Sequence, residues 1–166
     1  MKHSRRVPTA TLRKLNLLDE ARQEIRRAIQ CGEQFGHASA PWAAWAILAN
    51  IERDAGRPIV AAEEKRKAIE CYVAYRRDGG ENHHASGRIC FAVTQSLLTG
   101  DVTAATALLD QLATNSEAVR LNVFLRALQA IVTGSRDRTL ADDLDLDYTS
   151  AAEILFLIET LENTPS

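Results

Sequence analysis

The chain has 166 residues, of which 46% are apolar and 25% are charged, the balance of a soluble globular domain or a short repeat array. Its formal net charge of -2 argues against a dedicated nucleic-acid-binding protein, and its longest strongly apolar run, residues 154–158, is far shorter than the roughly 20 residues that cross a bilayer. Three cysteines without a repeated short spacing favour free thiols in a reducing, cytoplasmic compartment over a disulfide framework.

Apolar residues recur at intervals of three and four along most of the chain, so the sequence predicts an all-α fold. The first clear stripe lies in residues 21–29, where the charged positions, Arg22 among them, are expected to face away from it. The stripe consists of Ala21, Ile25, Ala28 and Ile29.

Two helices are predicted next, over residues 41–55 and 59–77. Pro41 suits a first helical turn, and Gly56 suits the turn between the two helices. The joint that follows has the sequence Asp-Gly-Gly-Glu-Asn-His-His. One of its glycines is expected to take the left-handed conformation that ends a helix, and Asn82 is expected to cap the next helix.

The second half of the chain continues the helical pattern. Helices are predicted over residues 85–99, 102–113 and 117–133. Residues 134–147 are rich in Asp and Arg and are predicted to be a connector. A last helix is predicted to start at the capping-box pattern Ser150-Ala151-Ala152-Glu153, with an acidic polar side.

Small residues keep a register along the chain. In the middle of the chain, a turn residue, Gly56, is followed by Ala61 and Ala68. The same frame recurs upstream as Asn16, Ala21 and Ala28, and downstream as Gly100, Ala105 and Leu112. The turn residues lie 40 positions apart (16 to 56) and 44 positions apart (56 to 100). A helix–turn–helix unit that repeats at this distance predicts a helical solenoid.

The middle unit resembles a tetratricopeptide repeat. The residues that carry the resemblance are Trp45, Leu48, Ala49, Gly56, Ala61 and Ala68. The chain departs from the family pattern at Glu52, where the family prefers Tyr, and at Lys65, where it prefers an aromatic residue. The chain is also similar to the C-terminal arrays of large multidomain bacterial repeat proteins, so a segment of a larger protein is one interpretation.

The resemblance implies a right-handed α-solenoid of antiparallel helix pairs that spans residues 1–166 as a single domain. It consists of a half repeat at about 9–31, repeats at 41–78 and 84–114, and a degenerate helix pair at 116–163. Such arrays are implied to be scaffolds that bind a partner peptide or helix in a concave groove lined by the first helix of each pair.

The expected groove residues follow from that implied arrangement. One stripe consists of Ala43, Ala46, Asn50 and Arg53, and the equivalent stripe of the next pair consists of Cys90, Thr94 and Leu97. The predicted protein-binding residues are Ala46, Asn50, Arg53 and Thr94. No catalytic, metal-binding or cofactor-binding residue is predicted, nor a nucleic-acid or membrane partner. Trp42 and Trp45 are expected to fill repeat interfaces.

Two alternatives stay open. The half repeat leaves an apolar stripe partly bare, which allows a homodimer through the N-terminal helix. The adjacent His83 and His84, with Cys90 close behind, allow a metal- or thiol-dependent enzyme, although their spacing is not that of a closed tetrahedral site.

Overall fold

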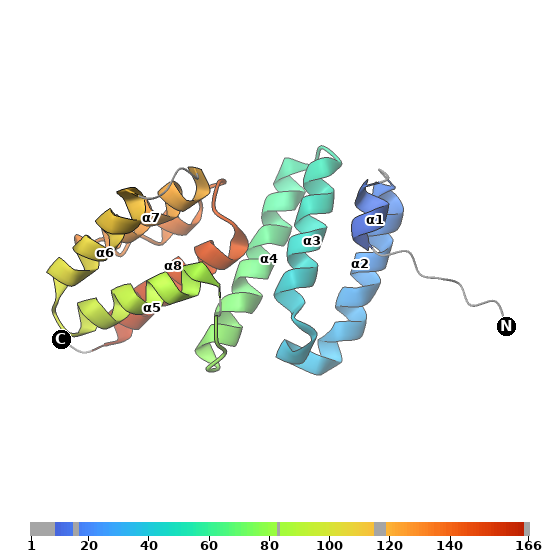
Figure 1. Ribbon diagram of the computed structural model, residues 1–166. Helices are drawn as coiled ribbons and strands as arrows, with labels where there is room; N and C mark the ends of the chain where they lie inside the picture. Colours follow the sequence, from blue (N-terminus) through green and yellow to red (C-terminus); the bar gives the residue numbers. More distant parts are fainter. Residues whose placement is uncertain (1–8, 15–16, 83, 115–118, 165–166) are drawn as a thin grey trace. The chain divides into compact units, whose positions relative to one another are not determined.

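The structure, a computed structural model, describes residues 9–14, 17–82, 84–114 and 119–164. The described residues form helices joined by turns and contain no strand, so the prediction of an all-α fold is confirmed (Figure 1). The chain forms two compact units, unit 1 (residues 1–71) and unit 2 (residues 72–166). None of the described helices combines the length and the apolar character needed to cross a membrane.

Unit 1 is built around the packing of one helix against two others: α2 contacts both α1 and α3. Its apolar core consists of Ala21 and Ile25 from α2 with Leu48 and Ile51 from α3. The bounds of its elements are Thr9–Lys14 (α1), Leu18–Gly32 (α2), the 3-10 helix Glu33–Ser39 (η1) and Pro41–Asp54 (α3), followed by Pro58–Arg77 (α4), whose last turns belong to unit 2.

Two positions of α2 differ from the predicted stripe. Ala28 is exposed, because α1 is about 9 Å long beside the roughly 22 Å of α2 and covers only part of that helix. Arg22, expected to face away from the core, is only 8% exposed. It is buried because α3 supplies a carboxylate, Glu52, at the place where the guanidinium enters the core.

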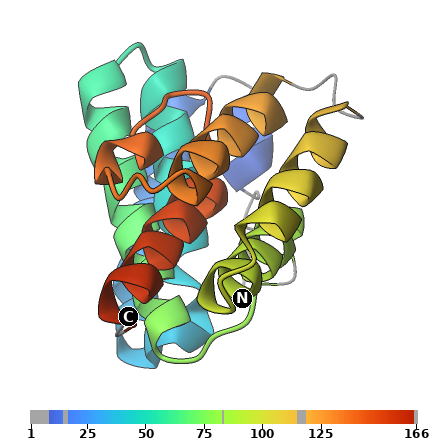
Figure 2. The same ribbon diagram turned by 90° about the vertical axis from the view of Figure 1, so that its left-hand side faces the viewer.

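Unit 2 is closed by its last helix. Its elements are Ala85–Leu98 (α5), Val102–Thr114 (α6), Val119–Val132 (α7), the 3-10 helix Arg138–Ala141 (η2) and Tyr148–Asn163 (α8). α5 contacts α6, α7 and α8, and α8 packs along α5 as well as against α7 and η2 (Figure 2). Val93, Leu109, Leu128 and Ile154, one from each helix of unit 2, are fully buried. Helices that are not adjacent in the sequence, such as α5 and α8, therefore pack against each other in this unit.

The last helix starts earlier than the capping-box pattern predicts. α8 begins at Tyr148, and its N-cap is Asp147, whose Oδ1 accepts a hydrogen bond from the backbone N–H of Ser150 at 2.8 Å. Glu153 does not reach back to a cap, since its side chain is buried and only 1% exposed. The predicted capping box is therefore wrong: Asp147, three positions upstream of Ser150, is the N-cap, and the side chain of Glu153 bonds to Asn82 instead.

Candidate protein-binding site

Helix α3 has one buried face and one accessible face, and it carries three of the four predicted binding residues. Its buried face includes Leu48 and Ile51, which pack on α2. On the other face Ala46 and Asn50 are half-buried and Arg53 is exposed. Because positions three or four apart lie above one another on a helix, these three side chains form one continuous stripe.

The polar part of the stripe is a hydrogen-bonded pair. Arg53 donates from Nη2 to the Oδ1 of Asn50. With Oδ1 occupied in this way, the amide nitrogen of Asn50 is the group left to donate to a ligand, and the guanidinium of Arg53 keeps its other N–H donors. Ile47, which is 39% exposed, adds apolar surface beside the pair. The stripe can therefore receive carbonyl or carboxylate oxygens together with an aliphatic side chain.

A buried ion pair fixes the orientation of α3. Glu52 is fully buried and accepts hydrogen bonds from Arg22, with Nε–Oε1 at 2.6 Å and Nη2–Oε2 at 3.2 Å. The hydrogen bond to Glu52 is the main reason why the pKa of Arg22 is raised. The bidentate contact with Arg22 on α2 compensates for burying the charge of Glu52.

The two tryptophans of α3 have structural partners. Trp45 packs against the core shared by α2 and α3, and the Nζ of Lys67 lies 4.5 Å from the centre of its ring. Trp42 contacts the ring of His37, with the ring centres 6.3 Å apart. Both side chains therefore hold α3 to its surroundings within unit 1, as aromatic residues at helix interfaces do.

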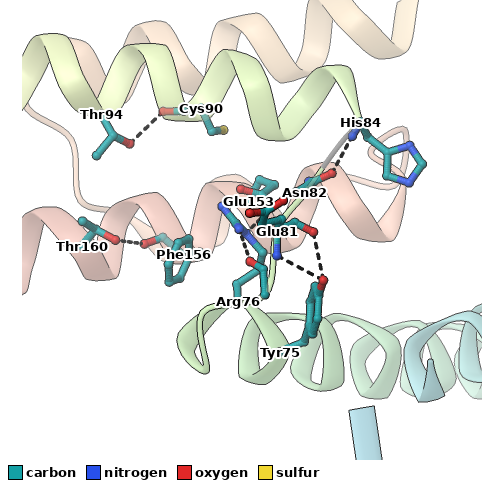
Figure 3. A network of polar contacts seen from close by, with 11 residues as sticks. Tyr75, Arg76, Glu81, Asn82, His84, Cys90, Thr94, Glu153, Phe156 and Thr160 are labelled. Atoms are coloured by element: carbon teal, nitrogen blue, oxygen red, sulfur yellow. Dashed lines mark hydrogen bonds and ion pairs between the residues drawn. The ribbon is translucent and has the colours of Figure 1, made fainter. Parts of the chain in front are cut away.

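The fourth predicted residue, Thr94, lies on α5 in unit 2. It is half-buried, and its Oγ1 donates to the carbonyl oxygen of Cys90 at 2.7 Å. Figure 3 shows Cys90 and Thr94 on the side of α5 that faces α8. Cys90 is 2% exposed, and burial raises the pKa of its thiol well above the ordinary value. Cys90 is thus a packing residue and not part of an open stripe, whereas Thr94 stays a prediction as a binding residue.

The joint between α4 and α5 encloses a buried polar network (Figure 3). Glu153 of α8 accepts a hydrogen bond from Nδ2 of Asn82 at 2.7 Å. The Nε of Arg76 lies 2.8 Å from Oε1 of the same carboxylate, so the two side chains form an ion pair. The N–H at Nε does not point toward that oxygen, so this contact is not a hydrogen bond. Arg76 also donates from Nη1 to the carbonyl oxygen of Gly80. The joint is therefore tied directly to the last helix of unit 2.

Two glycines of this region are required by the side chains that press on them. A Cβ at Gly80 would lie 2.3 Å from the ring of Tyr75, and a Cβ at Gly87 would lie 2.4 Å from Cγ of Asn82. The other glycine, Gly79, has φ of 85° and ends α4 in the left-handed conformation that one glycine of the pair was predicted to take.

Asn82 does not cap α5 in the predicted way. The N-cap of α5 is His84, which makes no side-chain capping hydrogen bond. Asn82 instead accepts from the backbone N–H of His84 at 2.9 Å and donates to Glu153. Sequence reasoning missed this role because a buried acceptor 71 residues away is invisible to local patterns.

The residues considered for metal or thiol chemistry are not brought together as far as they are described. His84 is exposed and Cys90 is buried, while His83 lies outside the described residues. Within the described part of the chain, no group of three or more His, Cys, Asp or Glu side chains is arranged to hold a metal ion.

Among the surface clefts lined by described residues of unit 2, the following two contain no predicted residue. One, of about 410 Å³, is lined by Ala113, Asn122, Leu125, Arg126 and Gln129. The other, of about 350 Å³, is lined by Val123, Arg126, Ala127, Thr139, Leu140 and Asp143. Arg126 lines both clefts. Its position there depends on how α7 packs, which no local sequence pattern predicts.

Comparison with known proteins places no relative beside this chain. No protein-family model matches it, no curated protein matches it, and no solved structure matches it.

Proposed function

We propose that the chain is a cytoplasmic protein–protein interaction module of the tetratricopeptide type, in which antiparallel helix pairs form a right-handed array. A peptide or helix of a partner binds along the accessible face of α3. Ala46 provides a close approach, while Asn50 and Arg53 donate hydrogen bonds to the partner.

The observation that carries the proposal is the Asn50–Arg53 pair. It lies on the accessible face of α3, and the opposite face of this helix is buried against α2. The hydrogen bond between them orients donors outward before any partner arrives, which lowers the entropy that binding must overcome. The repeat frame supports the family assignment, because the predicted turn residues Gly56 and Gly100 both have positive φ, 73° and 76°. In unit 2, α8 packs along α5, so the proposal rests on the accessible face of α3 in unit 1.

Site-specific photo-crosslinking tests the proposal. A photo-reactive amino acid at position 46 is expected to crosslink a specific partner in an extract of the source organism. The double variant Asn50→Ala/Arg53→Ala is expected to lose that crosslink and to keep the helical circular dichroism of the parent, since both side chains lie outside the core.

A matched control is available on α4. Glu63 and Arg66 are exposed and have the same spacing of three residues, so Glu63→Ala/Arg66→Ala changes surface polarity without touching α3. This control is expected to leave the crosslink unchanged. A crosslink that survives Asn50→Ala/Arg53→Ala at full yield would remove the α3 face as the binding site.

A further inference from the structure

One side of α5 is lined by exposed side chains that include large apolar residues. Phe91 is 62% exposed and Leu98 is 45% exposed, and Val102, at the start of α6, is 47% exposed. The whole stripe consists of His84, Arg88, Phe91, Gln95, Leu98 and Val102, all of them exposed. The opposite side of α5 contains the buried Cys90 and Val93 and is covered within unit 2.

The spacing of this stripe is that of a helix–helix seam. Within α5, Arg88, Phe91, Gln95 and Leu98 follow one another in steps of three, four and three residues, close to the average of 3.5 residues at which the two helices of a coiled coil contact each other. The sides of helices that face solvent in monomeric proteins are usually polar. Phe91 and Leu98 are large apolar residues that lie one heptad apart on such a side, so they indicate a contact surface.

The stripe is complementary to itself when a second copy runs antiparallel to it. With a two-fold axis beside Gln95, Phe91 lies about 6 Å along α5 on one side of the axis and Leu98 about 4.5 Å on the other. Each Phe91 then meets the Leu98 of the other copy. Arg88 lies near Asp101 of the other copy, and both residues are exposed. The described structure gives neither Arg88 nor the Asp101 carboxylate an oppositely charged partner within 4.0 Å. Oδ1 of Asp101 accepts a hydrogen bond from the backbone N–H of Ala104 at 2.9 Å, so Oδ2 is the oxygen left to attract Arg88.

We propose that the outer side of α5 is a self-association surface on which two copies of the chain pair antiparallel about Gln95. The contact is formed by one 14-residue helix from each copy with the start of α6, so the association is weak and depends on concentration. Apolar contact between Phe91 and Leu98 stabilises the pair, and the attraction between Arg88 and Asp101 selects the antiparallel orientation. The proposal does not depend on the binding role proposed for α3.

Disulfide trapping tests the geometry directly. The Cys31→Ser background removes the exposed native thiol. In this background, Gln95→Cys places one thiol of each copy beside the two-fold axis. There the two Cβ atoms can approach within the roughly 4 Å that a disulfide needs. Mild oxidation is expected to give a covalent dimer. Ala107→Cys, at an exposed position of α6 about 140° around the helix from Val102, is the matched control and is expected to stay monomeric.

Sedimentation velocity over a range of concentrations gives the independent measurement. Phe91→Gln is expected to weaken dimerisation by about ten-fold or more, and Arg88→Asp is expected to weaken it because it brings two like charges together. Ile59→Gln, at an apolar position of α4 that is 77% exposed, is expected to have no effect. A protein that stays monomeric up to high micromolar concentration, or one that crosslinks through Ala107→Cys but not through Gln95→Cys, would overturn the proposal.

Discussion

Arg22 and Glu52 form a buried, two-pronged ion pair that joins α2 to α3. Both Nε and Nη2 of the guanidinium contact the carboxylate, at 2.6 Å and 3.2 Å. Asp19 of α2 and Arg57 add further charge at its ends, since Asp19 accepts from Arg22 and Arg57 lies 3.6 Å from Glu52. A carboxylate with no exposed surface is tolerated only when such partners are present, so Glu52 of α3 depends on Arg22 of α2.

Removing one member of this pair is expected to destabilise unit 1. Glu52→Ala leaves the guanidinium of Arg22 largely buried without its main acceptor, and the free energy of unfolding is expected to fall by about 2–4 kcal/mol. Urea denaturation followed by circular dichroism measures the change. The double variant Arg22→Met/Glu52→Leu replaces the pair by apolar side chains of similar volume and is expected to unfold within about 1 kcal/mol of the parent. Equal losses for the single and double variants would contradict a role for charge pairing.

Gly87→Ala is expected to disrupt the joint between α4 and α5. The new Cβ would lie 2.4 Å from Cγ of Asn82, a side chain held by hydrogen bonds to His84 and Glu153. Such overpacking costs about 1–3 kcal/mol of unfolding free energy. A Cβ at position 87 would also lie 2.5 Å from Cβ of Asn82, so Asn82→Gly, which removes both atoms, relieves the clash. Gly87→Ala/Asn82→Gly is therefore expected to lose less stability than the two single losses added together. Strict additivity in this double-mutant cycle would show that the two residues are not in contact.

Local sequence signals located most helices and failed where distant residues decide the structure. The structure confirms the predicted start of α3 at Pro41 and the predicted end of α4 at Arg77, just before the glycine pair. These boundaries can be predicted because proline and glycine act on the backbone over only a few residues. Periodicity treats every charged residue as solvent-facing, so it placed Arg22 outside the core. It also gave no reason for α8 to pack along α5, because that choice depends on which apolar faces remain uncovered after the nearer helices have packed.

The resemblance predicts a binding stripe on α3, and that role stays a prediction, while the contact between its polar residues has no sequence signal. Asn50 and Arg53 lie on one stripe, as helix geometry requires. The hydrogen bond between them depends on side-chain rotamers that no pattern encodes. The exposed seam of α5 was missed for a different reason: Phe91 and Leu98 have the spacing of core residues, and only the packing of the other side of α5 leaves them exposed.

The three cysteines are expected to react in a fixed order with a thiol reagent such as Ellman's reagent. Cys31 is exposed, Cys71 is half-buried and Cys90 is buried beneath α8. Burial raises the pKa of the thiols of Cys71 and Cys90, and nearby negative charge, Glu70 and Glu153 respectively, adds to the effect, so little thiolate is present at neutral pH. The folded protein should label Cys31 rapidly, Cys71 slowly and Cys90 only on unfolding, and Cys31→Ser should remove the rapid phase. Rapid labelling of Cys90 would show that α8 does not cover α5.

The ion pair between Arg77 and Glu159 is expected to give a defined pH dependence. Arg77 donates from Nε to Oε2 of Glu159 at 2.9 Å, and this hydrogen bond is the main reason why the pKa of Glu159 falls below its usual value of 4.5. A folded-state pKa below the unfolded one stabilises the protein fully above the unfolded pKa, and that stability is lost as the pH falls through the folded-state pKa.

Arg77→Gln measures this contribution. Because the pair is partly exposed, the variant is expected to lose only about 0.5–1 kcal/mol of unfolding free energy near pH 7. The gap to the parent should stay constant down to roughly pH 5 and shrink toward about pH 3, as Glu159 becomes protonated in both proteins. Arg66→Gln, at an exposed arginine of the same helix, serves as the control and should show neither the loss nor the pH dependence. A gap between Arg77→Gln and the parent that persists undiminished at about pH 3 would mean that Arg77 stabilises unit 2 by packing and not through the charge of Glu159.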